Sequence, residues 1–197
     1  MRSILLSLFA LLLALSPVSA QNTNSAEQFV SGQIRSGLAI LNDASLSASA
    51  RADKFESFLL GITDLKRVAV YALGDAAATP AQRDAFVAAF NTYATAVYRS
   101  YFQRYSGQSL AVTGSRDAGA AGTLVHTSLV DPNGGAPLTV DFRVRIDNGK
   151  PLVLDIMIAG ISLAQTQHDD FAAYLARNHG DVDALTAHLN DVAKSYR

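Results

Sequence analysis

The chain has 197 residues and a formal net charge of −1, from 16 basic and 17 acidic side chains. Nucleic-acid binders need a concentrated positive face, so this balance argues against DNA or RNA as a partner. Cysteine is absent, which excludes disulfide bonds and leaves the hydrophobic core to stabilise the fold.

The first twenty residues have the pattern of a secretory signal peptide. Arg2 precedes an apolar run from Ile4 to Leu15, and Val18-Ser19-Ala20 is typical of a cleavage site. The apolar run is too short to span a membrane. We therefore expect residues 1–20 to be removed, and residues 21–197 to form one exported domain in a bacterial periplasm.

Helical patterns fill the first half of this domain. Ser25 is a suitable N-cap for a first helix, and a second helix is predicted from about Ser47 to Ile62. A third, short helix covers Leu65 to Leu73 and ends at Gly74, because glycine favours a left-handed C-terminal cap.

The fourth predicted helix carries the longest aromatic pattern. Thr79 is its expected N-cap, Pro80 its first residue and Gly107 its end. Such a stripe is typical of a core-facing helix, but it also fits an apolar cavity with a wet mouth, where tyrosine hydroxyls find polar partners. The residues alone leave both interpretations open. The stripe comprises Phe86, Phe90, Tyr93, Val97, Tyr101 and Tyr105.

The apolar period changes to two between Ser109 and Ala159. Alternation is strict in LTVDFRVRI, residues 138–146, which predicts a sheet with one covered and one wet face. Turn residues separate the strands, and Asp147-Asn148-Gly149-Lys150 is typical of a tight hairpin. The predicted strands are residues 109–116, 122–130, 138–146 and 151–159.

Helical patterns return after Gly160, where Gly180 ends one helix and Asp181 is suited to cap the next. The predicted fold class is therefore α+β. We expect a helical half packed on one face of a roughly four-stranded antiparallel sheet.

Residues suited to catalysis or metal binding do not converge in the sequence. None of the four histidines has another four residues away, and no nucleophile or phosphate-loop motif is present. In the polar cluster His168-Asp169-Asp170, adjacent helical residues would point about 100° apart and could not hold one metal together. We interpret the cluster as the acidic first turn of a helix, and we expect no catalytic residue, metal or cofactor.

Several stretches together resemble a known family. They are Asp64 to Gly74, TPAQRDAFVAAF at residues 79–90 with the tyrosine-rich helix after it, LVDPNGGAPLTVDFRVR at residues 129–145, and DIMIAGISLAQTQHDDF at residues 155–171. In this order and spacing they resemble the MlaC family of periplasmic phospholipid-binding proteins, also called the toluene-tolerance family. The resemblance covers most of the chain after about Phe55.

The resemblance implies a carrier and not an enzyme. Members of the family hold lipid tails in an apolar cavity between helices and sheet, with the head group near the surface. They move phospholipid between an inner-membrane ABC transporter with MCE-domain subunits and an outer-membrane lipoprotein–porin complex, which helps to maintain outer-membrane lipid asymmetry. By this resemblance residues 21–197 form a MlaC-like lipid-binding domain, which we expect to be a monomer. The family also includes hopanoid-associated members, so a relative that carries a lipid other than phospholipid is an alternative.

Face and period select the residues that we expect to contact the lipid tails. From the fourth helix these are Phe90, Tyr93, Val97 and Tyr101, and from the sheet they are Val140, Phe142, Val144, Leu154, Ile156 and Ile158.

Two other classes of protein remain open. A periplasmic module that binds protein and carries no lipid would use the aromatic stripe as ordinary core. An enzyme would need an acid/base pair, such as Asp155 with a histidine. Phospholipid in protein purified without detergent would favour the carrier over both.

Overall fold

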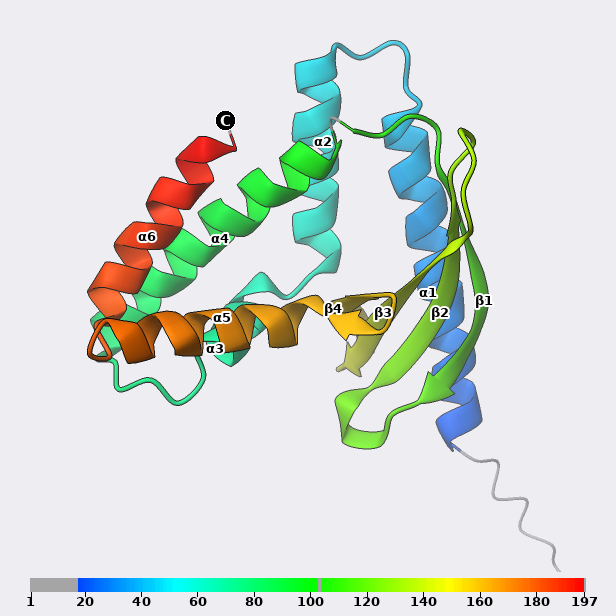
Figure 1. The fold of residues 1–197 in the computed structure, drawn as a ribbon. Coiled ribbons are helices and arrows are strands. Elements are labelled where there is room, and N and C mark those ends of the chain that lie inside the picture. The colour runs from blue at the N-terminus through cyan, green and yellow to red at the C-terminus, as the bar shows by residue number, and fades with distance from the viewer. Residues whose placement is uncertain (1–17, 103, 197) are drawn as a thin grey trace, which may run out of the picture.

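Residues 18–102 and 104–196 are described by the computed structural model of the protein (Figure 1). Over these residues the chain forms six α-helices, the 3-10 helix η1 and five strands. The helices are α1 (Val18–Leu41), α2 (Ala48–Ile62), α3 (Leu65–Leu73), α4 (Pro80–Phe102), η1 (Gly119–Ala121), α5 (Leu163–Arg177) and α6 (Val182–Ser195). The strands are β1 (Ser109–Asp117), β2 (Thr123–Val130), β3 (Leu138–Asp147), β4 (Lys150–Ile158) and β5 (Ile161–Ser162).

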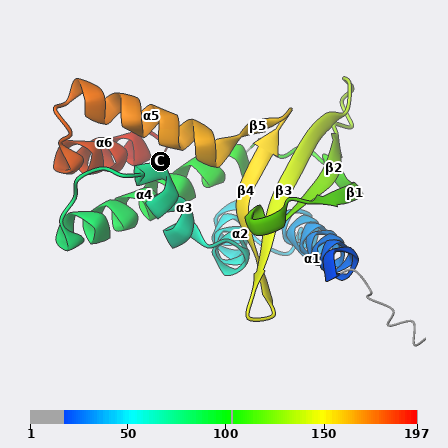
Figure 2. The ribbon, with the colours of Figure 1, turned by 90° about the horizontal axis from the view of Figure 1, so that it is seen from below.

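The strands form one antiparallel sheet in the order β1-β2-β3-β4-β5. Helix α1 lies across one face of the sheet and contacts β1, β2 and β3, whereas α3 to α6 gather beyond the β4–β5 edge (Figure 2). The predicted α+β class is confirmed, with a short fifth strand in addition to the four predicted ones. In the described part of the chain, no helix is both long and apolar enough to cross a bilayer.

Local hydrogen bonds start the helices where the sequence predicts. Ser47 Oγ accepts from the Ala50 amide at 3.2 Å, which begins α2. The Gln82 amide donates to Thr79 Oγ1 at 3.2 Å and the Thr79 amide donates to Gln82 Oε1 at 3.0 Å, which is a capping box at the start of α4. Asp181 caps α6.

The four long strands begin and end within one residue of the predicted bounds. The β3–β4 turn has φ values of 52° at Asn148 and 78° at Gly149. A two-residue turn with both φ values positive matches the twist of the flanking strands, which is why Asn-Gly is favoured there. The alternation and turn chemistry of the sequence therefore fix this half of the fold.

Two predicted helix boundaries were wrong. Helix α1 begins at Val18 and not at Ser25, because neither glycine nor proline interrupts residues 18–31. Helix α4 ends at Phe102 and not near Gly107. Residues 1–17, the main part of the predicted signal peptide, lie outside the described residues.

Two separate hydrophobic cores stabilise the described part of the fold. The larger core joins α3, α4, α5 and α6, and the rings of Phe86 and Phe90 both meet Phe171 edge-on there. The smaller core joins α1 to the sheet. It consists of Ala26, Val30, Val125 and Val144, with Phe29, Ile34, Val112 and Phe142 packed against it. The two cores have no residue in common.

A β-bulge changes the face of the residues in the first half of β4. Arg143 pairs with Asp155, but the next residue of β3, Val144, pairs with Val153, so Leu154 is an extra residue in β4. Ile156 and Val153 therefore share the face of Val144, although an unbroken period of two would place Leu154 there.

Candidate functional site

An apolar cavity of about 220 Å³ lies between α1, α2 and the sheet. We call it the α1–α2 cavity. None of the described residues that line it is charged, and its polar side chains are those of Gln33, Tyr105 and Gln108. Its apolar lining consists of Phe29, Val30, Ile34, Gly37, Leu38, Leu41, Phe55, Phe58, Leu59, Ile62, Leu110, Leu129, Phe142 and Val153.

Gly37 lets α1 and α2 approach each other at this cavity. A β-carbon at Gly37 would lie 3.2 Å from Phe58 Cε1 and 3.3 Å from Phe55 Cε2, which is tighter than ordinary contact. The two rings are tilted at 41°, with their centres 5.4 Å apart. The absent side chain thus leaves room for both phenylalanines, whose rings then border the cavity.

A second cavity of about 190 Å³ lies between α3, α4, α5 and strand β4. We call it the α4–α5 cavity. Its lining is apolar apart from a few groups, which include Tyr93, Tyr98, Asp155 and Gln167. Burial raises the pKa of the Tyr98 phenol, and the charge of Asp155 and the neighbouring Tyr93 raise it further. Gln167 Oε1 is buried without a hydrogen-bond partner among the described residues.

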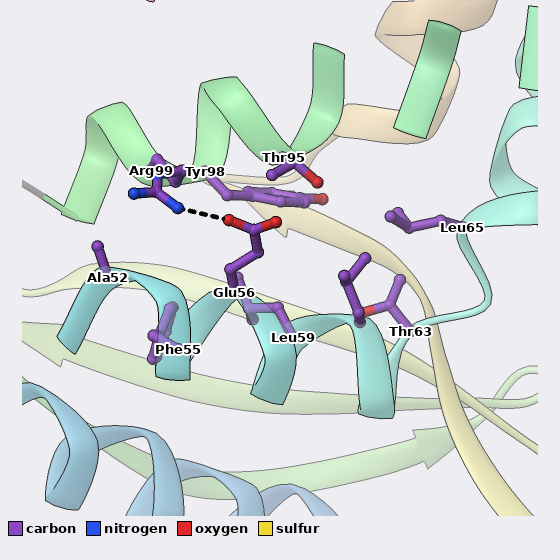
Figure 3. Close-up of a pocket in the computed structure, with 10 residues that line it drawn as sticks. Ala52, Phe55, Glu56, Leu59, Thr63, Leu65, Thr95, Tyr98 and Arg99 are labelled. Carbon is purple, nitrogen blue, oxygen red and sulfur yellow. Dashed lines mark hydrogen bonds and ion pairs between the residues drawn. The ribbon is translucent and has the colours of Figure 1, made fainter. Parts of the chain in front are cut away.

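The two cavities meet at Val153, which lines both. A narrow space of about 10 Å³ between α2 and α4 also adjoins each of them (Figure 3). It shares Phe55 and Leu59 with the α1–α2 cavity, and Thr63 and Tyr98 with the α4–α5 cavity. The three spaces therefore lie next to one another and share wall residues, and together we call them the apolar region.

An ion-pair cluster closes this narrow space on one side. Arg99 of α4 points toward α2, and its Nη1 lies 2.7 Å from Glu56 Oε2 and 2.7 Å from Asp53 Oδ1 (Figure 3). The hydrogen bonds to Glu56 and then to Asp53 raise the pKa of Arg99 above its usual value. The cluster joins α2 to α4 across the apolar region.

Six of the ten residues predicted to contact a ligand line a cavity. Phe90, Tyr93, Val97, Leu154 and Ile156 line the α4–α5 cavity, and Phe142 lines the α1–α2 cavity. Phe90 is also part of the helical core, with 3% of its surface exposed. The aromatic stripe of α4 therefore serves partly as core and partly as cavity wall. Ligand contact by these residues stays a prediction.

The other four predicted residues lie elsewhere. Val144 is 1% exposed and packs in the core between α1 and the sheet, while Val140 and Ile158 line neither cavity. Tyr101 belongs to α4, but its side chain is outside the described part of the structure. The middle of β3 packs against α1 in the smaller core. The face of the strand on which a residue lies therefore does not tell whether the residue belongs to this core or to a cavity wall.

Sequence reasoning missed the contribution of α1 and α2 to the lining. Their apolar faces are visible as amphipathic periodicity, for example Phe29, Ile34 and Leu38 on α1 and Phe55 and Phe58 on α2. The signal was present, but apolar periodicity has the same form for a helix that packs on a core and for one that borders a cavity.

The prediction that the polar cluster His168-Asp169-Asp170 forms the first turn of a helix was wrong. Helix α5 begins at Leu163, and Ser162 Oγ accepts from the Gln165 amide at 3.0 Å as its N-cap. The cluster therefore lies in the second turn. His168 Nδ1 lies 3.1 Å from the carbonyl oxygen of Tyr71, which ties α5 to α3.

Asp155 has a structural role at the start of α5. Its carboxylate accepts from Ser162 Oγ at 2.6 Å and from the Ala164 amide at 3.0 Å, and it lies 3.8 Å from Arg143 Nε. Among the described residues, the partners of Asp155 are therefore Ser162, Ala164 and Arg143, and none of them is a histidine. In the same part of the chain, no group of three or more histidine and acidic residues is placed to hold a metal ion.

Two adjacent apolar cavities in an α+β fold are typical of proteins that bind an apolar or amphipathic ligand. Residues 33–191 match the family model described as MlaC protein, and the chain belongs to the MlaC family. Its fold is similar to that of a phospholipid-binding protein from Ralstonia solanacearum, solved in complex with a phospholipid. The TM-score is 0.74 at 23% sequence identity, over 87% of this chain and 98% of the other.

Proposed function

We propose that this protein is a periplasmic lipid carrier that holds the acyl chains of a phospholipid in the α1–α2 and α4–α5 cavities. The two adjacent apolar cavities beside the two cores are the observation that carries this proposal. Membership of the MlaC family and the phospholipid bound to the structural relative support it. Export to the periplasm is supported by the predicted signal peptide.

The energetics of lipid transfer explain why such a cavity is needed. Two acyl chains with about 30 methylene groups would cost about 24 kcal/mol to expose to water, at about 0.8 kcal/mol per methylene. A cavity that is as apolar as a bilayer cancels most of this cost. Loading and unloading then come close to equilibrium, and the partners decide the direction of transfer.

Family membership favours two membrane partners. We infer that the protein exchanges lipid with an inner-membrane ABC transporter that has MCE-domain subunits and with an outer-membrane lipoprotein–porin complex, and that this exchange helps to maintain outer-membrane lipid asymmetry. Family membership also favours a protein that carries the lipid without changing it.

Paired tryptophan substitutions test the site of lipid binding. Leu110 and Leu129 pair across β1 and β2, and both line the α1–α2 cavity. The variant Leu110→Trp/Leu129→Trp fills part of the cavity. The adjacent pair, Ser109 and Val130, is exposed on the opposite face, so Ser109→Trp/Val130→Trp places two tryptophans on the same strands outside the cavity.

Each protein is purified from periplasm without detergent, and its lipid is extracted and measured by mass spectrometry. We expect phospholipid in stoichiometric amount in the wild type and in the Ser109/Val130 variant, and a marked loss in the Leu110/Leu129 variant. A wild-type protein without phospholipid would contradict the proposal. A triterpenoid lipid in its place would identify a hopanoid-type carrier.

A further inference from the structure

A basic hollow of about 500 Å³ adjoins the α4–α5 cavity at the edge of the sheet. It lies between the first turns of α3 and α5, strands β3 and β4, and the 3-10 helix η1. Arg67, Arg143 and Arg145 line it, whereas Asp155 is the one acidic side chain among the described residues of its wall. We call this hollow the arginine pocket.

The carboxylates that pair with two of these arginines lie outside the wall of the pocket. Asp147 Oδ2 lies 2.6 Å from Arg67 Nη1, and Asp147 Oδ1 accepts from Arg145 Nε at 2.8 Å. Asp64 Oδ2 lies 3.3 Å from Arg67 Nε. Each guanidinium group has five N–H donors in a fixed fork, so these contacts orient Arg67 and Arg145 and leave donors for a ligand.

Arg143 has only long contacts with the described residues. Its Nε lies 3.8 Å from Asp155 Oδ2 and its Nη2 lies 3.9 Å from Met157 Sδ. Asp155 is already bonded to Ser162 and Ala164. The side chain of Arg143 is 26% exposed, so a cationic fork is held at the pocket wall without a close oxygen acceptor. Oxyanions of phosphate groups satisfy such a fork with two parallel hydrogen bonds.

The arginine pocket lies next to the α4–α5 cavity. Val68, Leu154, Asp155 and Ala164 line both this pocket and the α4–α5 cavity. Leu154 is the extra residue of the β4 bulge, so the bulge places a leucine at the boundary between apolar and basic space. Helices α3 and α5, which both contribute residues to the two spaces, contact each other (Figure 1).

The walls of the α1–α2 cavity, the α4–α5 cavity and the arginine pocket become more polar in that order. The α1–α2 cavity has no charged wall residue, the α4–α5 cavity adds tyrosines and one carboxylate, and the arginine pocket has three guanidinium groups. A glycerophospholipid has the same order, from acyl chains through the ester-linked glycerol to a phosphate diester with one negative charge.

We propose that the arginine pocket binds the phosphate group of the carried lipid, with Arg143 as its direct ligand and with Arg67 and Arg145 beside it. This inference rests on the proposed function, because the lipid tails must occupy the adjoining cavities for the phosphate to reach the pocket. It predicts that the protein separates phospholipid from diacylglycerol by the phosphate itself.

The test compares the affinities for phosphatidylglycerol and for diacylglycerol with the same acyl chains, by displacement of a fluorescent apolar probe that has no phosphate. We expect the wild type to prefer phosphatidylglycerol by on the order of tenfold, the effect of a charge-assisted hydrogen-bond pair. Arg143→Gln should bind both lipids equally, while Arg143→Lys keeps part of the preference. Arg177→Gln, an exposed arginine at the far end of α5, is the matched control and should retain all of it.

The outcomes separate this inference from the proposed function. Unchanged binding of diacylglycerol by Arg143→Gln shows that the variant is folded and that its apolar region is intact. An unchanged preference for phosphatidylglycerol in this variant would overturn the phosphate site and leave the carrier function standing. Tight binding of inorganic phosphate alone would also overturn it, because the pocket would then be a site for a free anion. A wild type that binds neither lipid would overturn the proposed function itself.

Discussion

Gly74 lies directly against the imidazole ring of His168. A β-carbon at Gly74 would come within 2.6 Å of His168 Cε1, and the backbone of Gly74 has φ 61° and ψ −143°. Glycine is required there twice: once for a backbone conformation that other residues rarely adopt, and once for the space that the ring fills. Leu73 and Gly74 end α3, and the glycine thus also allows α5 to pack against α3.

Substitution of this glycine should destabilise the fold. We expect Gly74→Ala to lower the free energy of unfolding by about 1–3 kcal/mol, measured by urea denaturation, because the strained backbone alone costs that much. Removing the ring as well, in Gly74→Ala/His168→Ala, relieves the steric overlap but not the backbone strain, so this double variant should stay less stable than His168→Ala.

Gly61→Ala provides the matched control for this prediction. Gly61 lies within α2, and nothing lies within 4 Å of a β-carbon there. Alanine should leave stability unchanged or raise it by up to about 1 kcal/mol, since it favours the helix. If Gly74→Ala were as stable as the wild type, neither the left-handed backbone at Gly74 nor its close contact with His168 would be present in solution.

The buried carboxylate of Asp155 should matter for stability and not for chemistry. Asp155→Ala leaves the Ser162 hydroxyl and the Ala164 amide without their acceptor, and we expect a loss of about 1–3 kcal/mol in the free energy of unfolding. Asp170→Ala removes an exposed carboxylate from the same region and should change stability by less than about 0.5 kcal/mol. A fully stable Asp155→Ala protein would contradict the capping role.

Acid should weaken the ion pairs at the β3–β4 hairpin. The hydrogen bond from Arg67, followed by that from Arg145, lowers the pKa of Asp147 below its usual value. A carboxylate with a lowered pKa in the folded state contributes stability above its unfolded pKa, and this contribution is lost as the pH falls through the folded pKa. Asp147→Asn should therefore be less stable than the wild type at pH 7.

The difference between these two proteins should shrink as the pH falls below about 3.9, the ordinary pKa of an aspartate. Urea denaturation across this range measures it. In a background of Arg67→Gln/Arg145→Gln, the change Asp147→Asn should have little further effect at either pH. An equal effect in both backgrounds would show that the two arginines do not stabilise the carboxylate.

Loss of the contact between Arg99 and α2 should loosen this helix more than it destabilises the whole protein. The pairs with Asp53 and Glu56 are partly exposed, so Arg99→Gln should cost no more than about 1 kcal/mol. Amide hydrogen exchange in residues 48–62 should become faster. Lys54→Gln breaks a pair on the same helix, with Asp43 at 3.6 Å, and should leave the contact with α4 intact. Equal exchange in the two variants would contradict the prediction.

The parts of the fold that local chemistry determines could be predicted from the sequence. The strand at residues 138–146, the Asn148-Gly149 turn and the caps at Thr79 and Asp181 each depend on neighbouring residues alone, and each is confirmed. The buried Asp141 and the exposed Leu138 depart from the predicted covered and wet faces of this strand. The start of α1 was wrong for the same kind of reason. Ser25 is a good cap, but no glycine or proline lies between Val18 and Ser25 to prevent the helix from beginning earlier.

The site was harder to predict, because it depends on which elements meet. In Leu152-Val153-Leu154 every residue suits either face of a strand, so nothing in the sequence marks Leu154 as the extra residue of a bulge. Val144 and Phe142 share one face of β3, yet one is core and the other borders a cavity. That distinction is set by where α1 lies on the sheet, which is a long-range contact.

Helix α2 has a consequence for the proposed carrier function, because its order depends on whether the cavity is filled. No residue of α2 is fully buried, and its phenylalanines face the α1–α2 cavity and not either core. Lipid tails in the cavity would complete the packing of this helix, so binding and the order of α2 are thermodynamically linked. A partner that contacts α2 would then meet a firm surface on a loaded carrier and a loose one on an empty carrier. Cargo status would be readable from outside the molecule, without direct contact with the lipid.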